Sequence, residues 1–542
     1  MKFKLRSSAR QDVQNIGLIF LIGVLIYSNS LRGEFVSDDH VYIADSRISQ
    51  NFGNIPAVRQ FYYTRFVVGL TFAANYFLHG FNVFGYHLVN LILHLVNSLL
   101  VYSLVVLTFE TPYLKKIKPL NLKPSHAAFF TSLIFLVHPI QTQAVSYISQ
   151  RFTLMAAMFY LLTLVFYIKN QLTQERRYLI LSWVSFGLGL FSKEMAMTAF
   201  PAILIYGWFF LKPGIKISLK DLKGKDFIPF YAMIAVYSLL LAFDKYASVS
   251  QWNAHINLKR FDLWYLFTEI NVLRTYLRLL VLPIDQNHNY DYPVVQNIFD
   301  GEFLFSLLLL IVLTFGAVRS FNKERLLSFC VVWFFVALSV ETMSVVFGNR
   351  GVIYEHWLYL PMVGFALFLV IMISKITKDK VGFKGLLIVI IVFMGLAAYN
   401  RNKIWRTETG LWQDVADKAP NSSFAYFALG VAYERKENFP KAKESYEKAI
   451  SLKPDDVKAH SNLAVVLYKM GDDPSALKHW KRAIALEPSN PVLYKNLGYF
   501  YYEKNDCVKA LEYYHKAVEL KVDHQDVASY IEECQKCPNC RK

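Results

Sequence analysis

Residues 85–108 read GYHLVNLILHLVNSLLVYSLVVLT and contain no Asp, Glu, Lys or Arg. A helix of about 20 mostly apolar residues is long enough to cross a bilayer, so this stretch predicts a membrane-spanning helix. His87 and His94 are seven residues apart and share one helix face. Histidines at this spacing are most often packing or interfacial groups. The fold is therefore decided by how many such stretches the chain contains.

The whole composition indicates a membrane protein. Of 542 residues, 54% are hydrophobic, 16% are aromatic and 18% are charged, and the mean hydropathy is +0.28. Soluble globular chains carry about 25% charged residues, and this composition excludes a disordered or collagen-like chain. We predict an all-α, polytopic transmembrane bundle of about 11 spans, followed by a helical solenoid. The expected spans are residues 14–30, 85–108, 127–145, 152–168, 178–192, 196–211, 228–243, 303–319, 326–343, 355–374 and 385–399.

The distribution of basic residues predicts the topology. The net charge is +17, and Lys and Arg favour cytoplasmic loops. With these 11 spans all six basic clusters fall on one side, so the N-terminus is expected in the cytoplasm and residues 401–542 outside. This excess is a topology signal rather than a nucleic-acid footprint. The first apolar segment could also be a signal peptide, although no clear cleavage site follows it. The clusters are Lys2–Arg10, Lys115–Lys123, Lys169–Arg177, Lys212–Lys225, Arg319–Arg325 and Lys375–Lys384.

Two further apolar stretches break this charge pattern if they cross the membrane. Residues 264–282 include Glu269, Arg274 and Arg278, and residues 60–80 follow the first outer loop. We therefore predict amphipathic helices that lie at the interface or pack against the bundle.

The C-terminal part repeats every 34 residues. Leu429-Gly430, Leu463-Ala464 and Leu497-Gly498 keep this spacing, and Pro454 and Pro488 end successive units. A 34-residue period with small residues at fixed offsets is typical of tetratricopeptide (TPR) repeats, each a pair of helices. We expect a transmembrane domain at 1–400, a linker helix at 401–420, and a TPR domain at 421–542 with three repeats and a C-terminal capping segment.

Acidic, basic and polar residues gather in the predicted outer loops. They include the adjacent Asp38 and Asp39, the segment HPIQTQAVSYISQR from His138 to Arg151, and Lys193-Glu194. An acidic pair at a helix end is often only a cap or a solvated face, but ionisable groups at membrane depth often mark function. A carboxylate can act as a general base, and Arg or Lys can bind a phosphate. This set fits transfer of a sugar from a lipid-phosphate donor.

Taken in order, SDDH, FGYHLVNLILH, HPIQTQAVSYISQR, SKE, NYDYP and EHWLYLPMVGF resemble the transmembrane and TPR-containing O-mannosyltransferase family and its bacterial relatives. The resemblance implies a glycosyltransferase of the GT-C type that uses a polyprenyl-phosphate sugar and inverts the anomeric centre. It implies that Asp38 and Asp39 are catalytic, without deciding which is the base. Gln143 and His356 depart from the Glu and Arg expected in animal members. The candidate residues for donor phosphate and sugar are Arg65, His138, Arg151, Lys193, Glu194, Arg350 and His356.

The TPR domain is expected to present a protein acceptor, because TPR stacks bind extended peptides or proteins on a concave surface. A scaffold or dimerisation role is the alternative. No cofactor is required, and a divalent metal is not predicted. Cys534, Cys537 and Cys540 could form a disulfide or, with Cys507 or His524, a metal site. The candidate groove residues are Tyr426, Tyr433, Asn462, Tyr468, Asn496 and Tyr499.

The sequence thus predicts a protein O-glycosyltransferase, a hexosyltransferase acting on Ser/Thr hydroxyls at the outer face. Two alternatives remain: the same chemistry on a glycolipid or surface polymer, and a non-enzymatic assembly factor or transporter with a TPR scaffold. Partners would be the lipid-linked donor, a protein acceptor and membrane lipids, without nucleic acid. The short repeat array and a composition rich in Lys, Asn, Phe and Tyr favour a bacterial inner membrane, with the active site and TPR domain on the periplasmic side.

Overall fold

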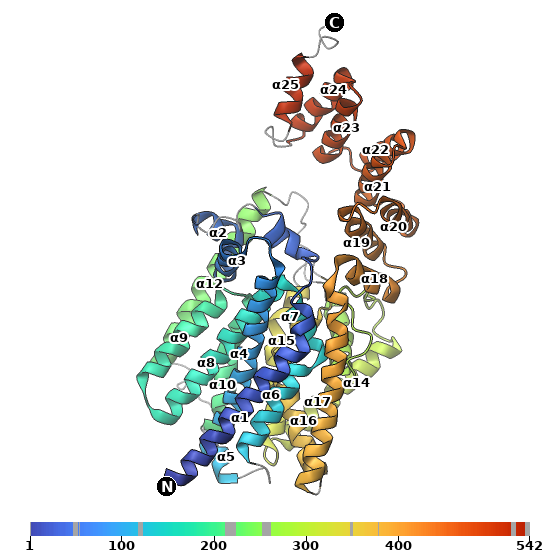
Figure 1. Ribbon diagram of the computed structural model, residues 1–542. Coiled ribbons are helices and arrows are strands. Elements are labelled where there is room, and N and C mark those ends of the chain that lie inside the picture. Colours follow the sequence, from blue (N-terminus) through green and yellow to red (C-terminus); the bar gives the residue numbers. More distant parts are fainter. Residues whose placement is uncertain are drawn as a thin grey trace. The chain divides into compact units, whose positions relative to one another are not determined.

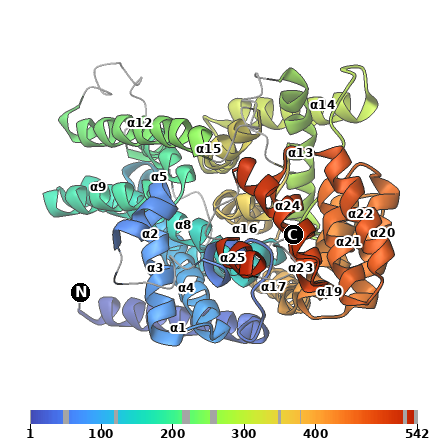
Figure 2. The same ribbon diagram turned by 90° about the horizontal axis from the view of Figure 1, so that it is seen from above.

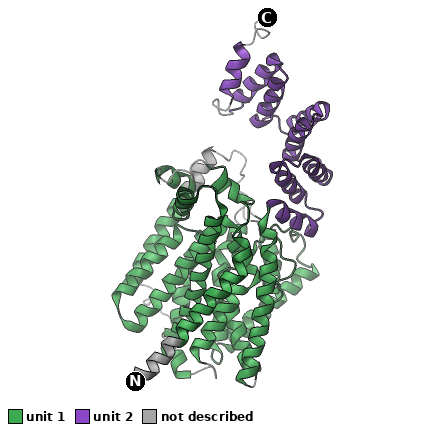
Figure 3. Cartoon of the chain, in the orientation of Figure 1, with its two compact units in different colours: residues 1–407 green, residues 408–542 purple. Residues whose placement is uncertain are grey.

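The computed structural model divides the chain into two compact units, residues 1–407 and residues 408–542 (Figure 3). Within the described residues the secondary structure is helical, with no strand. This confirms the predicted all-α class. The structure describes residues 2–46, 53, 55–117, 123–211, 224–251, 262–346, 351–377, 379–521 and 527–536, with side chains excepted at 2–10 and 244–251.

Unit 1 is a bundle of long apolar helices (Figures 1 and 2). In the described part of the chain, eight helical segments are long and apolar enough to cross a membrane, or nine if a bent pair is one span. The helices of the eight segments are α1 (Lys2–Tyr27), α4 (Val83–Phe109), α8 (Arg151–Thr173), α10 (Ala199–Tyr206) with its flanking turns, α12 (Ile228–Gln251), α14 (Gly301–Ser320), α15 (Arg325–Val346) and α17 (Lys380–Asn402).

The other three predicted spans are also helical but are not among these eight segments. The expected continuous span 127–145 consists of α6 (Pro124–Val137) and a second part made of the turn Pro139–Gln141 and α7 (Thr142–Ser146), and the two parts are bent by 53°. The break follows from Pro139, which lacks an N–H and clashes with the preceding turn. α9 (Arg176–Leu190), which packs on α8 and α12, has the predicted length but lies two residues earlier, and α16 (Pro361–Ile376) is shorter than the predicted span 355–374.

The connections fall at two ends of the bundle (Figure 1). α1 begins at the end that also holds α5 (Pro112–Ile117), the α8–α9 turn and the α16–α17 turn, where predicted basic clusters lie. α2 (Ile55–Tyr62) and α3 (Phe66–His79) lie at the opposite end. The amphipathic helix predicted at 264–282 is α13 (Leu263–Val281), which packs on α14 and α15.

Polar side chains of α4 form hydrogen bonds with neighbouring segments inside the bundle. His94 Nδ1 lies 2.7 Å from Tyr359 Oη, and His94 Nε2 lies 3.0 Å from Leu136 O. The Asn97 side-chain amide donates to Leu154 O at 3.0 Å. Hydrogen bonds of this kind hold neighbouring membrane helices together. These α4 residues therefore serve packing, and they place the α6–α7 break and the Tyr359 segment side by side.

Unit 2 starts with α18 (Glu408–Lys418) and continues as three helix pairs and a final helix. Gly430 lies so close to the Tyr446 ring that an added Cβ would come within 2.5 Å of it, which explains the small residue there. Side-chain caps recur every 34 residues, at Ser422, Asp456 and Asn490 for the first helices and at Asn438, Asp472 and Asp506 for the second. The helices are α19 (Ser423–Arg435), α20 (Phe439–Leu452), α21 (Val457–Lys469), α22 (Asp473–Leu486), α23 (Pro491–Glu503), α24 (Cys507–Glu519) and α25 (Ala528–Lys536).

Candidate active site

Asp39 is held in place by hydrogen bonds from the buried turn that contains Ser149. It follows α1 in the loop that leads into a π-helical turn, His40–Ala44, and its side chain is fully buried. Its Oδ1 accepts hydrogen bonds from the Ser149 backbone N–H at 2.6 Å and from the Ser149 hydroxyl at 2.5 Å. Its Oδ2 accepts from the Val36 N–H at 3.1 Å. Asp39 therefore fixes the acidic loop on the segment after the α6–α7 break.

Asp38 presents its side chain to solvent, in contrast to its neighbour. Its backbone N–H donates to Tyr147 Oη at 2.9 Å. The preceding residue, Ser37, has a φ of 52°, a left-handed conformation that is uncommon for a residue other than glycine. This conformation turns the chain so that adjacent carboxylates face different surroundings, one buried and one open.

Both carboxyl groups have raised pKa values. Burial raises the pKa of Asp39 to about 7, although the hydrogen bonds from Ser149 and Val36 oppose the shift. Partial desolvation by the surrounding protein also raises the pKa of Asp38, and a hydrogen bond from Tyr147 counteracts it. A carboxylate with a raised pKa is a stronger base than a fully solvated one, which suits proton abstraction near neutral pH.

A cluster of aromatic rings, formed by Tyr147, Trp405 and His288, lies beside the acidic pair. The Tyr147 ring stacks on Trp405, with centroids 5.6 Å apart, and meets His288 edge-on at 5.4 Å. His288 Nε2 lies 3.4 Å from the Ser37 hydroxyl. Burial, and then the positive charge of Arg401, lower the pKa of His288 to about 3, so this imidazole is neutral at physiological pH.

A chain of hydrogen bonds continues from His288 to His356. Gln143 Nε2 lies 3.3 Å from His288 Nδ1, and Gln143 Oε1 accepts from the His356 backbone N–H at 2.7 Å. His356 Nδ1 lies 3.0 Å from the same oxygen. Gln143 and His356, the two positions at which the resemblance leads us to expect other residues in animal members, are thus direct partners. Segments 37–39, 143–149, 288 and 356, distant in sequence, meet at one site.

Glu355 organises the loop that carries His288. Its buried carboxylate accepts from the Gln286 amide at 3.0 Å, the Asn287 N–H at 2.6 Å and the Tyr290 hydroxyl at 2.7 Å. The pKa of Glu355 is raised, because the effect of burial outweighs the opposing effect of the nearby positive charge of Arg401. Carboxylates with several donors are strongly oriented, so Glu355 positions the loop rather than facing solvent.

Two cations lie in ion pairs near this network. Arg65 Nη2 is 2.7 Å from Glu194 Oε1, and Lys193 Nζ is 2.7 Å from Glu341 Oε1. Burial and then the charges of Lys193, His288 and Arg65 hold the pKa of His356 well below its usual value. The same charges are therefore close enough to act on an anion bound beside His356.

Other predicted donor-site residues are embedded in the bundle. Arg151 is fully buried, and it donates to Asn90 Oδ1 at 3.0 Å and to Tyr86 O at 3.0 Å. Buried His138 contacts Leu280 O through Nε2 at 3.0 Å and accepts from the Ile140 N–H. Arg350 lies outside the described residues. The sequence interpretation singled out none of Tyr147, Ser149, His288 and Glu355, although the motifs quoted above contain three of them and His288 directly precedes the NYDYP motif.

In unit 2, a cavity of about 660 Å³ lies between α18, α19 and α20. Tyr426 and Tyr433 line it, with Lys448 5.9 Å and Lys441 5.3 Å from the respective ring centroids. Tyr499 is 41% exposed. Asn462, Tyr468 and Asn496 are half-buried on first helices of later repeats, outside this cavity.

The structure describes three of the candidate cysteines. Cys330 and Cys534 are buried and Cys507 is half-buried, whereas Cys537, Cys540 and His524 fall outside the described residues. Over the part of the chain that the structure describes, no group of three or more His, Cys, Asp or Glu side chains could hold a metal ion.

Comparisons with known proteins agree with the motif resemblance. A TPR repeat family model matches residues 435–471 and 466–505. A protein O-mannosyl-transferase of Caenorhabditis elegans is 26% identical, covering 82% of this chain and 63% of that protein. Protein O-mannosyl-transferase TMTC3 of Homo sapiens is 24% identical, covering 84% and 53% respectively. Human TMTC4 is 24% identical, covering 76% and 62%. A solved structure, "Crystal structure of MamA", aligns with a TM-score of 0.20 at 22% identity and covers 26% of this chain and 75% of that one.

The resemblance is therefore confirmed, because the homologues of this chain are protein O-mannosyl-transferases and TPR repeats are present. The chain spans less than two thirds of the length of these curated relatives. Its apolar helices and these relatives identify it as an integral membrane protein.

Proposed function

We propose that this chain is a glycosyltransferase that moves a sugar from a polyprenyl-phosphate donor to Ser or Thr hydroxyls of a protein. The observation that carries the proposal is the division within the acidic pair. Asp38 is exposed and has a raised pKa, while Asp39 is buried and bonded to Ser149. The O-mannosyl-transferase homologues support the reaction class.

In the proposed reaction Asp38 is the general base, and Asp39 is a positioning residue. Asp38 takes the proton of the acceptor hydroxyl as the hydroxyl oxygen attacks the anomeric carbon. A new glycosidic C–O bond forms on one face, and the C–O bond to phosphate breaks on the other. The configuration therefore inverts, the polyprenyl phosphate leaves with the bonding electron pair, and Asp38 carries the proton away.

The leaving phosphate requires nearby positive charge. We assign this role to Lys193 and Arg65, which lie near His356, with Glu194 and Glu341 as their orienting partners. Arg350 stays a candidate from the sequence. We assign Arg151 and His138 to helix packing instead, because their polar atoms are used within the bundle.

The TPR unit is proposed to recruit the protein acceptor, since TPR surfaces bind peptides and proteins. The positive-inside pattern supports a cytoplasmic N-terminus, with the acidic pair and the TPR unit on the outer side of a bacterial inner membrane. No metal enters the proposed chemistry. The carboxylate base accepts the proton of the acceptor hydroxyl, and the cationic side chains stabilise the negative charge on the leaving phosphate.

The test is sugar transfer by the purified full-length chain in nanodiscs, with decaprenyl-phosphate mannose and decaprenyl-phosphate glucose as parallel donors. Asp38→Asn should abolish transfer while the protein stays folded and inserted. Asp45→Asn, a carboxylate in the same loop, is the matched control and should retain transfer. Undiminished transfer by Asp38→Asn would refute the assignment of the base.

A further inference from the structure

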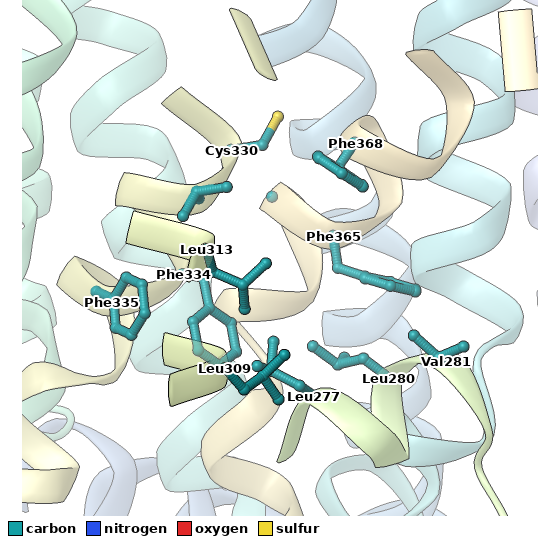
Figure 4. A pocket seen from close by; sticks show the side chains of 12 residues that line it. Leu277, Leu280, Val281, Leu309, Leu313, Cys330, Phe334, Phe335, Phe365 and Phe368 are labelled. Atoms are coloured by element: carbon teal, nitrogen blue, oxygen red, sulfur yellow. The ribbon is translucent and has the colours of Figure 1, made fainter. Parts of the chain in front are cut away.

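The cavity of unit 2 differs in chemistry from an apolar cavity of unit 1. The unit 1 cavity, about 280 Å³ between α13, α14, α15 and α16, is lined by hydrophobic side chains and Cys330, and no polar side chain takes part (Figure 4). The unit 2 cavity, about 660 Å³ between α18, α19 and α20, combines two tyrosines with charged, hydroxyl and amide side chains. A ligand of this second cavity therefore has to offer both apolar and polar groups.

Two tyrosine–lysine pairs repeat along the unit 2 cavity. The Lys448 ammonium of α20 lies 5.9 Å from the ring centroid of Tyr426 in α19. The Lys441 ammonium lies 5.3 Å from the ring centroid of Tyr433. In each helix the two members are seven residues apart, and the pairs match in antiparallel register. The cavity therefore presents the same combination of groups twice.

The distance between the two pairs matches one kind of peptide backbone. Seven residues of an α-helix rise about 10.5 Å. A polyproline II segment rises about 3.1 Å per residue with three residues per turn, so residues i and i+3 share one side about 9.3 Å apart. In an extended strand, residues on one side lie about 6.7 Å or 13.4 Å apart. The polyproline II period therefore fits the two pairs, and the strand period does not.

The lining favours a neutral ligand that is rich in carbonyl groups. Its formal charges cancel, because Glu444 and Glu447 accompany the two lysines. Among the described residues, none is hydrogen-bonded to the hydroxyl of Tyr426 or Tyr433, and hydroxyl and ammonium groups donate to carbonyls. A proline-rich segment has no internal backbone hydrogen bonds, and aromatic-lined grooves are the surfaces that recognise it.

The second repeat shows that the helix pair does not need these residues in order to pack. Its four equivalent positions, 34 residues further on, hold His460, Leu467, Ser475 and Arg482. The helices α21 and α22 nevertheless form the same pair as α19 and α20. The tyrosine–lysine pairs of the first repeat are therefore not a requirement of the fold.

The third repeat restores the residue types, but its tyrosines have partners. The equivalent positions there hold Tyr494, Tyr501, Lys509 and Lys516. The Tyr513 ring stacks on Tyr501, with centroids 5.5 Å apart. The Tyr494 hydroxyl donates to Pro488 O at 3.0 Å. Tyr494 is thus a matched control for the loss of Tyr426.

We infer that the unit 2 cavity binds a proline-rich segment of the acceptor protein in the polyproline II conformation. Prolines three residues apart would lie against Tyr426 and Tyr433, and the hydroxyl and ammonium donors would bind the carbonyls between them. The inference rests on the proposed function, because it takes unit 2 to recruit the acceptor. The Ser or Thr that receives the sugar would lie elsewhere in the acceptor.

The test is fluorescence anisotropy of labelled peptides with the full-length chain in nanodiscs. The probe repeats Pro-Gln-Ala four times and contains no Ser or Thr, and a second peptide of the same composition holds its prolines in adjacent pairs. The probe should bind about tenfold more tightly, because only its spacing reaches both tyrosines. Equal affinities would overturn the inference. Tighter binding of a Glu-rich peptide would also overturn it and indicate a site for acidic peptides.

Single variants locate the binding. Tyr426→Ala should weaken binding of the probe about tenfold, whereas Tyr494→Ala should leave it unchanged, with helical content checked by circular dichroism in both. Equal weakening in the two variants would contradict the inference. The salt dependence is a second measurement that needs no variant: the affinity should stay nearly constant as salt is added, because the probe is neutral, and a steep fall would count against the site.

The two proposals fail separately. Asp38→Asn should bind the probe as the unmodified chain does, because that carboxylate belongs to unit 1. If the probe binds as expected but no donor gives transfer, the proposed function fails and the docking site stands. If transfer is measured but the probe does not bind, the inference fails and the proposed function stands.

Discussion

Asp39 and Ser149 are joined by two hydrogen bonds to a single oxygen, from the backbone N–H and the hydroxyl, across 110 residues of sequence. No solvent reaches this contact, since Asp39 is fully buried and Ser149 is 1% exposed. The acidic loop is therefore anchored to the α6–α7 break by a carboxylate that burial holds at a pKa of about 7. Its protonation is coupled to folding.

The first prediction concerns the pH dependence of stability. An unfolded Asp has a pKa near 3.9, so the native state binds more protons than the unfolded state between about pH 4 and pH 7. The free energy of unfolding should therefore fall as pH rises through this window, by up to about 1.4 kcal/mol per pH unit from Asp39 alone. Asp39→Asn should remove this component of the slope, as measured by denaturant unfolding in detergent micelles.

The comparison is between slopes rather than absolute stabilities, because Glu355 is also buried and has a raised pKa in both proteins. Asp45→Asn serves as the control and should keep the slope of the unmodified chain. If Asp39→Asn unfolds with the same pH dependence as its parent, the raised pKa assigned to Asp39 is wrong.

The second prediction concerns Tyr147 and the base. Tyr147→Phe removes the hydrogen bond that lowers the pKa of Asp38 but keeps a ring that can stack on Trp405. The acidic limb of the pH–rate profile should move to higher pH, while the free energy of unfolding falls by about 1 kcal/mol. Both effects are read from transfer rates across pH and from unfolding in parallel.

Tyr160→Phe is the matched control, because it also removes one hydrogen bond of a buried tyrosine hydroxyl. The Tyr160 hydroxyl is buried and donates to Thr198 O at 3.2 Å, and Thr198 is not a residue of the candidate active site. It should cost comparable stability without moving the acidic limb. An identical shift in both variants would show that the limb reports stability rather than the ionisation of Asp38.

How much of this site the sequence could predict depends on the range of the contacts. The spans and the TPR pairs follow from local hydrophobicity and a 34-residue period, and the adjacent Asp38 and Asp39 are visible as a motif. His288 reaches Ser37 across 251 residues, and Gln143 reaches His356 across 213. A single sequence read by itself holds no signal for such pairings.

Arg151 shows that the sequence can also suggest a site residue that the structure places in helix packing. Charge and position made it a candidate for phosphate, yet its guanidinium donates to Asn90 and Tyr86 of α4. A buried arginine satisfied by carbonyls cannot be distinguished by sequence from one that faces a ligand. The bend at Pro139 is similar, because the apolar run 127–145 continues through it.

The third prediction separates charge from stability at Lys193. The Lys193–Glu341 pair is buried, with side chains 5% and 2% exposed. Lys193→Met should destabilise the protein by about 3–5 kcal/mol, because Glu341 is left buried without its counter-ion. The double variant Lys193→Met with Glu341→Gln should recover most of this loss, as measured by a double-mutant cycle in thermal unfolding.

Transfer activity should not recover in the double variant, because the positive charge assigned to the donor phosphate is still missing. Recovery of both stability and transfer would reduce Lys193 to a structural role. The KM for the donor distinguishes the cases further, since loss of a phosphate contact raises it while a merely looser fold lowers the active fraction.

The last prediction concerns the acceptor. Tyr426 and Tyr433 line the unit 2 cavity beneath Lys448 and Lys441, and aromatic residues in pockets carry much of the energy of protein recognition. The double variant Tyr426→Ala with Tyr433→Ala should lower transfer to a folded protein acceptor by about tenfold and leave transfer to a short Ser/Thr peptide unchanged. Phe424→Ala, an exposed aromatic on the same helix outside the cavity lining, is the control and should affect neither. Equal loss with both acceptors would place the defect in the fold or the catalytic unit, and no loss with either would exclude this cavity from acceptor binding.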